Sequence, residues 1–129
     1  FVPCSISKPY QGSQTHARLK RRLRESGIEF VEESAVVVTG LGVIPRSMWE
    51  HPVTLNYDVC IRDCYRLLGL LRSFLTVNSP GVVYDCLSYP PYRDILRIAC
   101  RDTDTPEPAR PVDFRPPSGW RKAYGSWLA

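Results

Sequence analysis

The sequence lacks the signatures of the common classes of enzyme. Gly40-Leu41-Gly42 is the nearest fragment to a phosphate-binding glycine loop, and it is too short for a Walker-type or G-x-G-x-x-G motif. The chain has only two histidines, His16 and His51, and no local motif pairs either of them with a nucleophile. We therefore expect a protein that is not an enzyme.

Closely spaced cysteines are also missing. The five cysteines are Cys4, Cys60, Cys64, Cys86 and Cys100. An odd number without tight loop spacings argues against a secreted disulfide framework, so we expect reduced thiols in an intracellular protein of the nucleus or cytoplasm. Cys60 and Cys64 could bind zinc with Cys86, Cys100 or His51. However, a C-x3-C pair on an apolar helix lacks the turn of a zinc knuckle, and we expect core residues and no cofactor.

No apolar stretch is free of charge for long enough to cross a membrane. The longest apolar-periodic run, residues 58–77, contains Arg62, Asp63, Arg66 and Arg72. Its apolar residues recur at spacings of three and four, which predicts a helix buried against a sheet. No signal or transit peptide is visible, and the start at Phe1 suggests an excised domain.

The other segments predict an α+β domain. The expected elements are a strand in 1–10, a helix over 14–26, a central strand around 35–38, a strand at 52–57, the helix at 58–77 and a strand at 82–89. This βαββαβ order predicts a ferredoxin-like split βαβ fold, with a four-stranded antiparallel sheet and both helices on one face.

A further helix and a tail follow this core of residues 1–90. Residues 92–101 fit either a helix or a strand, and Pro91 in a first turn favours a helix over 91–102. We therefore expect one domain over residues 1–102. Residues 103–129 are expected to form a Pro-rich extended segment and an aromatic tail, packed on the domain or on a partner.

Positive charge is concentrated in the first predicted helix. The candidate nucleic-acid contacts there are Gln14, His16, Arg18, Lys20, Arg21, Arg22 and Arg24. Lysines and arginines on one rigid surface supply most of the non-specific affinity for nucleic acids. The alternatives are a solvated helix face or a nuclear-import signal, because the sequence KRRLR fits both.

Two further groups of residues are weaker candidates. Arg93, Arg97 and Arg101 recur every four residues and extend the basic surface only if the fold brings them beside the first helix; otherwise they form a solvent face paired with neighbouring aspartates. In the tail, Trp120, Tyr124 and Trp127 could stack on bases, but such a segment more often docks on its own domain or on a partner copy.

At the level of element order only, a basic first helix in a split βαβ domain resembles two viral families. These are the dimeric DNA-binding domains of papillomavirus transcription and replication regulators and of gammaherpesvirus episome-maintenance antigens. The resemblance covers residues 1–90, rests on no shared motif, and implies a homodimeric nucleic-acid-binding protein of viral or nuclear origin. RNA-recognition domains share the topology, but their aromatic sheet motif is absent.

The sequence therefore predicts a non-catalytic domain that binds DNA or RNA through phosphate contacts of a basic helix, with no membrane partner. The alternative is a protein-interaction or assembly module, including self-association. That module would use the aromatic tail or an open sheet face carrying some of Val36, Val38, Val53 and Tyr57.

Overall fold

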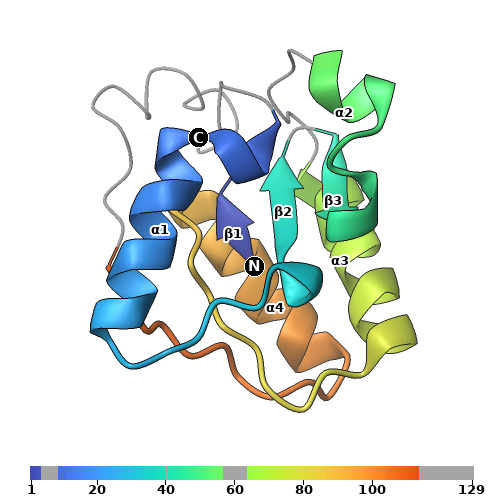
Figure 1. The fold of residues 1–129 in the computed structure, drawn as a ribbon. Coiled ribbons are helices and arrows are strands. Elements are labelled where there is room, and N and C mark those ends of the chain that lie inside the picture. Colours follow the sequence, from blue (N-terminus) through green and yellow to red (C-terminus); the bar gives the residue numbers. More distant parts are fainter. Residues whose placement is uncertain (4–8, 40, 57–63, 114–129) are drawn as a thin grey trace.

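The fold has three layers, with a mixed β-sheet between helices (Figure 1). The computed structural model describes residues 1–3, 9–39, 41–56 and 64–113. The described strands are β1 (Val2–Pro3), β2 (Val36–Thr39) and β3 (Gly42–Pro45). The described helices are α1 (Gln14–Glu25), α2 (Pro52–Asn56), α3 (Cys64–Asn78) and α4 (Pro90–Asp102), with 3-10 turns at Tyr10–Gly12, Glu32–Ser34 and Arg46–Met48.

Strand β2 is the centre of the sheet. It pairs in parallel with β1, with Val2 opposite Val37, and antiparallel with β3, where Ile44 lies opposite Val37. All four residues of β2 are buried. Successive side chains of a strand point to opposite faces, so a run of β-branched residues suits a strand that is covered on both sides.

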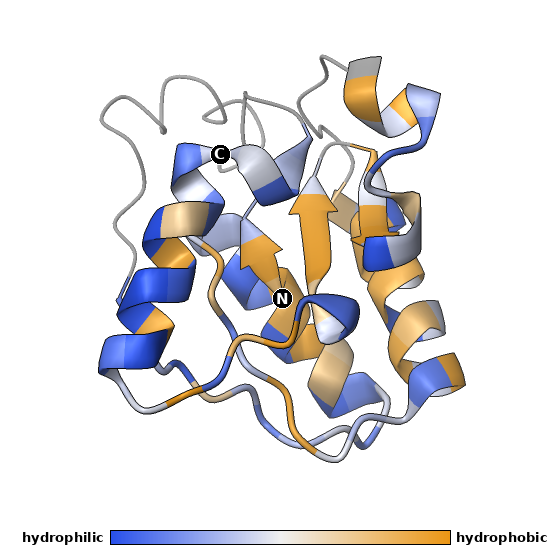
Figure 2. Ribbon diagram, in the orientation of Figure 1, coloured by the Kyte–Doolittle hydropathy of each residue, from blue (hydrophilic) through white to orange (hydrophobic). Residues whose placement is uncertain are grey.

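Each face of β2 packs into a separate hydrophobic core. Val37 belongs to the core beneath α1, which includes Leu19 and Leu23. Val38 belongs to the core beneath α3 and α4, which includes Leu71 and Leu96. Figure 2 shows apolar colouring on the strands and on most of α3, and mostly polar colouring on α1. Helix α1 therefore covers one face of the sheet, and α3 with α4 covers the other.

Helix α1 confirms the prediction for residues 14–26. The Ser13 hydroxyl accepts a hydrogen bond from the backbone N–H of His16 at 3.2 Å, which caps the first turn. At the other end, Gly27 has a φ of 79°, the left-handed conformation that commonly follows a helix.

Helices α3 and α4 form the second helical layer. Leu67, Leu71 and Leu75 bury one stripe of α3, as the apolar periodicity predicted. Residues 58–63 of the predicted helix lie outside the described ranges. Helix α4 confirms the helical alternative for residues 92–101, with Pro90 and Pro91 in its first turn.

The predicted ferredoxin-like sheet is wrong. The described sheet is mixed and has three strands, and α1 lies on the opposite face from α3. Two segments predicted as strands, 52–57 and 82–89, supply no strand to the described sheet. Residues 52–56 form helix α2 rather than a strand, because Pro52 suits a first helical turn better than a sheet ladder. Strand β1 is parallel to β2 because α1 returns the chain to the same end of the sheet.

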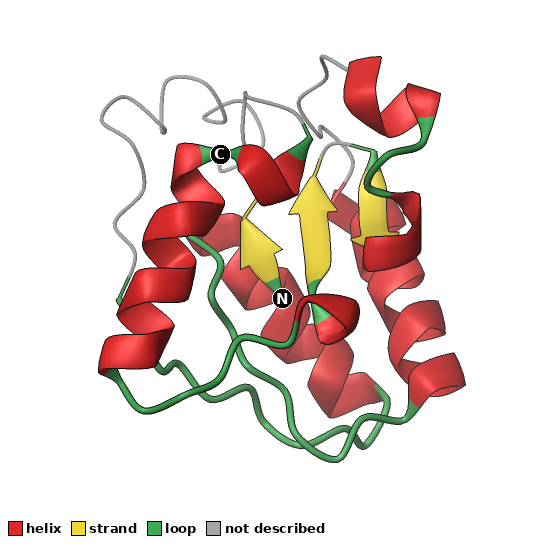
Figure 3. Cartoon of the chain, viewed as in Figure 1, coloured by secondary structure: helices red, strands yellow, loops and turns green. Residues whose placement is uncertain are grey.

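Residues 82–89, predicted as a fourth strand, form no strand and are drawn as loop in Figure 3, apart from one isolated bridge at Tyr84. The backbone N–H of Cys86 donates to the carbonyl of Phe1 at 2.9 Å, beside β1. On its other side, the backbone N–H of Asp85 donates to the carbonyl of Ala109 at 2.8 Å, and the backbone N–H of Ala109 donates to the carbonyl of Val83 at 3.0 Å. These two bonds form one isolated bridge between Tyr84 and Ala109. This segment therefore links the start of β1 to the extended chain that follows α4.

Within the described ranges, no helix combines the length and the apolar character needed to span a bilayer.

Replacing Gly42 by alanine should destabilise the fold. Gly42 has a φ of 125°, and an added Cβ would lie 2.7 Å from Leu70 Cδ1 on α3. We expect a loss of about 1–3 kcal/mol in the free energy of unfolding, measured by urea denaturation. The control is Gly69→Ala on α3, where nothing lies within 4 Å. Alanine there should stabilise the helix by about 0.5–1 kcal/mol, so equal effects of the two changes would contradict this account.

Candidate nucleic-acid interface

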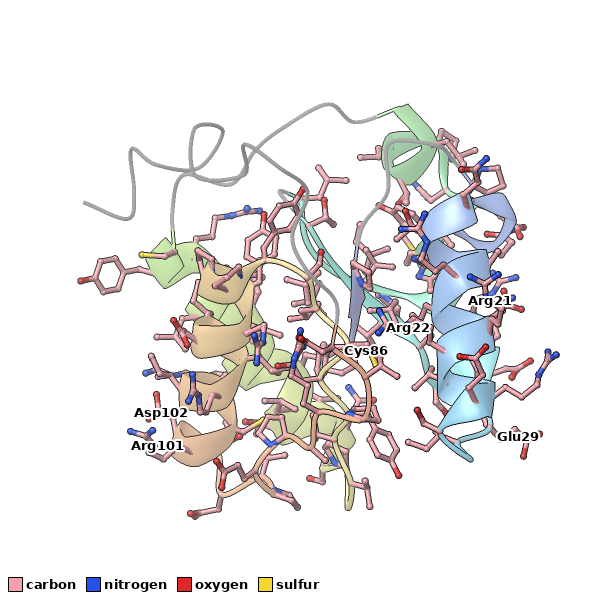
Figure 4. The ribbon with its side chains drawn as sticks, turned by 90° about the vertical axis from the view of Figure 1, so that its left-hand side faces the viewer. Arg21, Arg22, Glu29, Cys86, Arg101 and Asp102 are labelled. Atoms are coloured by element: carbon pink, nitrogen blue, oxygen red, sulfur yellow. The ribbon has the colours of Figure 1, made fainter. Side chains whose placement is uncertain are left out.

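Helix α1 presents arginines on the face opposite its core contacts. His16, Leu19 and Leu23 are buried. Arg18, Arg21 and Arg24 are exposed, and we call these three residues the arginine face. The helical repeat of 3.6 residues places them away from the buried stripe. Figure 4 shows Arg21 pointing away from the body of the protein.

No residue of the arginine face forms an ion pair with another described residue. Successive members are three residues apart, so each step rises about 4.5 Å along the helix axis and the row spans about 9 Å. That length is comparable to a few phosphates of one nucleic-acid strand, which rise about 3.4 Å each along a duplex. The three cations are therefore available to a polyanion.

Lys20 and Arg22 flank the arginine face but are half-buried. Lys20 Nζ lies 4.0 Å from Glu32 Oε1 and 5.4 Å from the centre of the Phe30 ring. The same carboxylate oxygen is 3.6 Å from Arg46 Nε. Lys20 is thus partly neutralised within the protein and contributes less to an outer positive surface than its position in the sequence suggested.

The outer surface of α1 offers no aromatic ring. Its exposed positions are Gln14, Ala17, Arg18, Arg21, Arg24 and Glu25. Stacking of bases requires aromatic or planar groups set in a groove, so this surface favours phosphate contacts over base stacking. Gln14 is the polar amide on this face.

His16 does not belong to the candidate interface, although the sequence placed it there. Its side chain is fully buried, and its Nε2 donates to the carbonyl of Pro3 at 2.8 Å. The ring stacks on Tyr10 at 5.7 Å between centroids and meets the edge of Trp49 at 5.3 Å. A side chain without exposed surface cannot contact nucleic acid, so His16 serves the core under α1. Burial lowers the pKa of His16 and keeps the ring neutral.

The arginine row on α4 does not join the arginine face. Figure 4 shows Arg101 on α4 and Arg21 on α1 at opposite sides of the molecule. Arg97 forms an ion pair with Asp94 on the same helix, and Arg93 Nε lies 3.3 Å from Asp85 Oδ2. The two basic segments are therefore separate surfaces, because the sheet lies between α1 and α4.

Asp85 is the centre of a polar cluster that sequence analysis missed. This residue is 7% exposed, and its Oδ1 accepts a hydrogen bond from the backbone N–H of Leu87 at 2.9 Å. Arg110 Nη1 lies 3.4 Å from the same Oδ1 and donates to the Leu87 carbonyl at 2.9 Å. The cluster fastens the chain after α4 to the extended segment 82–88. Arg110 is distant in sequence from Asp85, and no local pattern links them.

The cysteines offer no metal site among the described residues, where no group of three candidate ligands is found. Cys64 is half-buried, Cys86 and Cys100 are buried, and all three are free thiols. Burial raises the pKa of the Cys86 and Cys100 thiols, which disfavours the thiolate that binds zinc. Cys60, the fourth member of the proposed zinc set, lies outside the described ranges.

The surfaces named for protein interaction are covered or lie outside the described residues. Val36 and Val38 are buried in β2, so neither supplies an open sheet face. Val53 is exposed, but on helix α2. Tyr57 and the tail residues Trp120, Tyr124 and Trp127 fall outside the described ranges.

Residues 1–66 match the model of a family described as a domain of unknown function (DUF5591), and the chain belongs to this family. The match spans just over half of the 129 residues and includes β1, α1, β2, β3 and α2. The arginine face therefore lies inside the family region. No curated protein and no solved structure matches the chain.

The buried His16 should make stability depend on pH. Its pKa is lowered in the folded protein, whereas an unfolded histidine titrates near about 6.5. Below about pH 6.5, His16 binds a proton in the unfolded chain but stays unprotonated in the folded protein until the pH is lower. The free energy of unfolding should therefore fall as the pH falls.

Urea denaturation between about pH 5 and 8 measures this slope, a window that spans the ordinary histidine pKa. His16→Gln retains an amide donor for the Pro3 carbonyl and should flatten the slope, whatever it does to stability at neutral pH. A slope that survives His16→Gln would contradict this assignment.

Loss of the Asp85 charge should weaken the fold. The asparagine of this variant can still accept from the Leu87 N–H, but Arg93 loses its carboxylate partner and Arg110 keeps only the exposed Asp113. Because both arginines are partly exposed, we expect Asp85→Asn to cost about 2–3 kcal/mol in urea denaturation, less than a wholly buried pair would. Asp94→Asn removes only an exposed partner of Arg97 and should cost less than about 1 kcal/mol. Equal losses would show that Asp85 is not a structural anchor.

Proposed function

We propose that this chain is a non-catalytic nucleic-acid-binding domain in which the arginine face of α1 contacts the phosphate backbone. The observation that carries this proposal is the exposure of Arg18, Arg21 and Arg24 on one rigid helix without an acidic partner among the described residues. Surface cations that only solubilise a protein are commonly interspersed with carboxylates. On the outer positions of α1, Glu25 is the one carboxylate.

Helix α1 is held rigidly against the sheet. Leu19 and Leu23 anchor it to the sheet, and Ser13 caps its first turn. The backbone of the interface therefore needs little ordering when a ligand binds, and only the arginine side chains lose freedom. Phosphate contacts of this kind position a protein on nucleic acid without reading its sequence, so we propose weak sequence preference.

The chemistry of the surface suits DNA and RNA alike, because both present the same phosphate groups. The lack of an aromatic ring on this face favours a duplex or a folded backbone over an unstructured single strand. Non-specific contacts of this type give dissociation constants of about 10⁻⁴ to 10⁻⁶ M at physiological salt. A second copy of the domain on the same duplex would strengthen such binding through avidity.

Reversing the charge of the arginine face should abolish binding. We expect the wild-type protein to bind a duplex oligonucleotide with a slope of log affinity against log salt of about −2.7, for three phosphate contacts. Replacing Arg18, Arg21 and Arg24 by Glu should remove this salt-dependent binding in fluorescence anisotropy. The three residues are exposed, so the fold should survive the change, which circular dichroism checks.

The control replaces Arg66, Arg72 and Arg101, three exposed arginines of α3 and α4, by Glu, and circular dichroism checks its fold because Arg72 forms an ion pair with Asp102. Either triple change takes the formal net charge from +4 to −2, so a general charge effect would weaken binding equally in both variants. The proposal requires the control to retain most of the affinity. The affinities measured for duplex DNA, duplex RNA and a single strand then show which nucleic acid the protein binds best.

A further inference from the structure

A small cavity on the α4 side of the molecule is lined mainly by charged side chains. It has a volume of about 120 Å³ and lies between α4 and the extended chain after it. The residues that line it are Asp85, Arg93, Arg97, Glu107, Pro108 and Arg110. A water molecule occupies about 30 Å³ in the liquid, so the cavity has room for a tetrahedral oxyanion.

Three arginines line this cavity from two elements. Arg93 and Arg97 lie one turn apart on α4, and Arg110 belongs to the segment that follows α4. Asp85 holds the first and the last of these in place, through Arg93 Nε at 3.3 Å and Arg110 Nη1 at 3.4 Å. The Nη groups of Arg93 donate to no other described residue. The two Nη groups at the end of the planar Arg93 guanidinium are therefore available to donate to a ligand.

Arg97 is the arginine of this group that can most easily change its ion-pair partner. Its ion pair with Asp94 is exposed on both sides, and such surface pairs contribute about 0–1 kcal/mol. Arg97 can thus exchange Asp94 for an anion in the cavity at low cost. Arg93 and Arg110, in contrast, are fixed by the buried carboxylate of Asp85.

Each arginine of the lining has an acidic partner: Asp85 for Arg93, Asp94 for Arg97, and both Asp85 and Asp113 for Arg110. Asp94 and Asp113 are exposed, and surface pairs of this kind contribute little, so an anion in the cavity can compete with them at low cost. A bound oxyanion would accept several charge-assisted hydrogen bonds from these guanidinium groups.

We propose that this cavity binds a single phosphate group, with Arg97 and the Nη groups of Arg93 as donors and Asp85 as the anchor of the site. The site lies on the opposite side of the sheet from the arginine face, so it does not depend on nucleic-acid binding by α1. The phosphate can be inorganic phosphate or the phosphate of a mononucleotide, since both offer the same oxygens to arginine.

Titration with inorganic phosphate, followed by amide chemical shifts, tests the proposal. We expect saturable shifts at Asp85, Arg97 and Glu107, which line the cavity. Arg97→Ala should weaken binding about tenfold or more, the size expected for a lost charge-assisted hydrogen bond. Glu107→Gln should tighten binding, because it removes a negative charge from the lining.

Arg101→Ala is the matched control, since Arg101 lies one turn beyond Arg97 on α4 and does not line the cavity. It should bind phosphate as the wild-type protein does. Absence of saturable shifts, shifts confined to α1, or an Arg97→Ala titration equal to that of wild type would each overturn the proposal. Titration with 5′-AMP and with adenosine identifies the source of the phosphate. Tighter binding of 5′-AMP than of inorganic phosphate, with no binding of adenosine, indicates a nucleotide. Equal affinity for 5′-AMP and inorganic phosphate indicates free phosphate.

Discussion

Burial of β2 on both faces is the constraint on which this structure depends. Val37 and Val38 are adjacent in the chain, yet each packs into a different core. A sheet with two apolar faces needs a helical layer on each side, since exposed β-branched side chains would forfeit the hydrophobic contribution of burial. Helix α1 supplies one layer, and α3 with α4 supplies the other (Figure 1).

The layered arrangement separates the charged surfaces. Because α1 and α4 lie across the sheet from each other, their arginines cannot act on one ligand surface (Figure 4). The two groups also differ in their partners. The arginine face has no acidic partner among the described residues, whereas Arg93 and Arg110 share the buried Asp85. An extended polyanion suits the first, and a single small anion suits the second.

Local rules predicted the helices well. Ser13 and Gly27 fixed the limits of α1, and the leucine spacing of α3 identified its buried stripe. Residues 52–56 show where such rules fail, because a short alternating segment fits a strand as well as a helix. The ferredoxin-like topology followed from that error, from the assignment of residues 82–89 as a fourth strand, and from the expectation of an antiparallel sheet.

The sequence by itself determined which residues carry charge, which segments form long helices and which strand is buried on both sides, because these depend on composition and local periodicity. Only the tertiary structure decided that His16 faces the core, that Arg110 reaches Asp85, and that Arg101 lies far from Arg21. Each of these outcomes depends on which face of the sheet a helix covers. That choice results from the packing of distant segments and is not encoded in the period of any one of them.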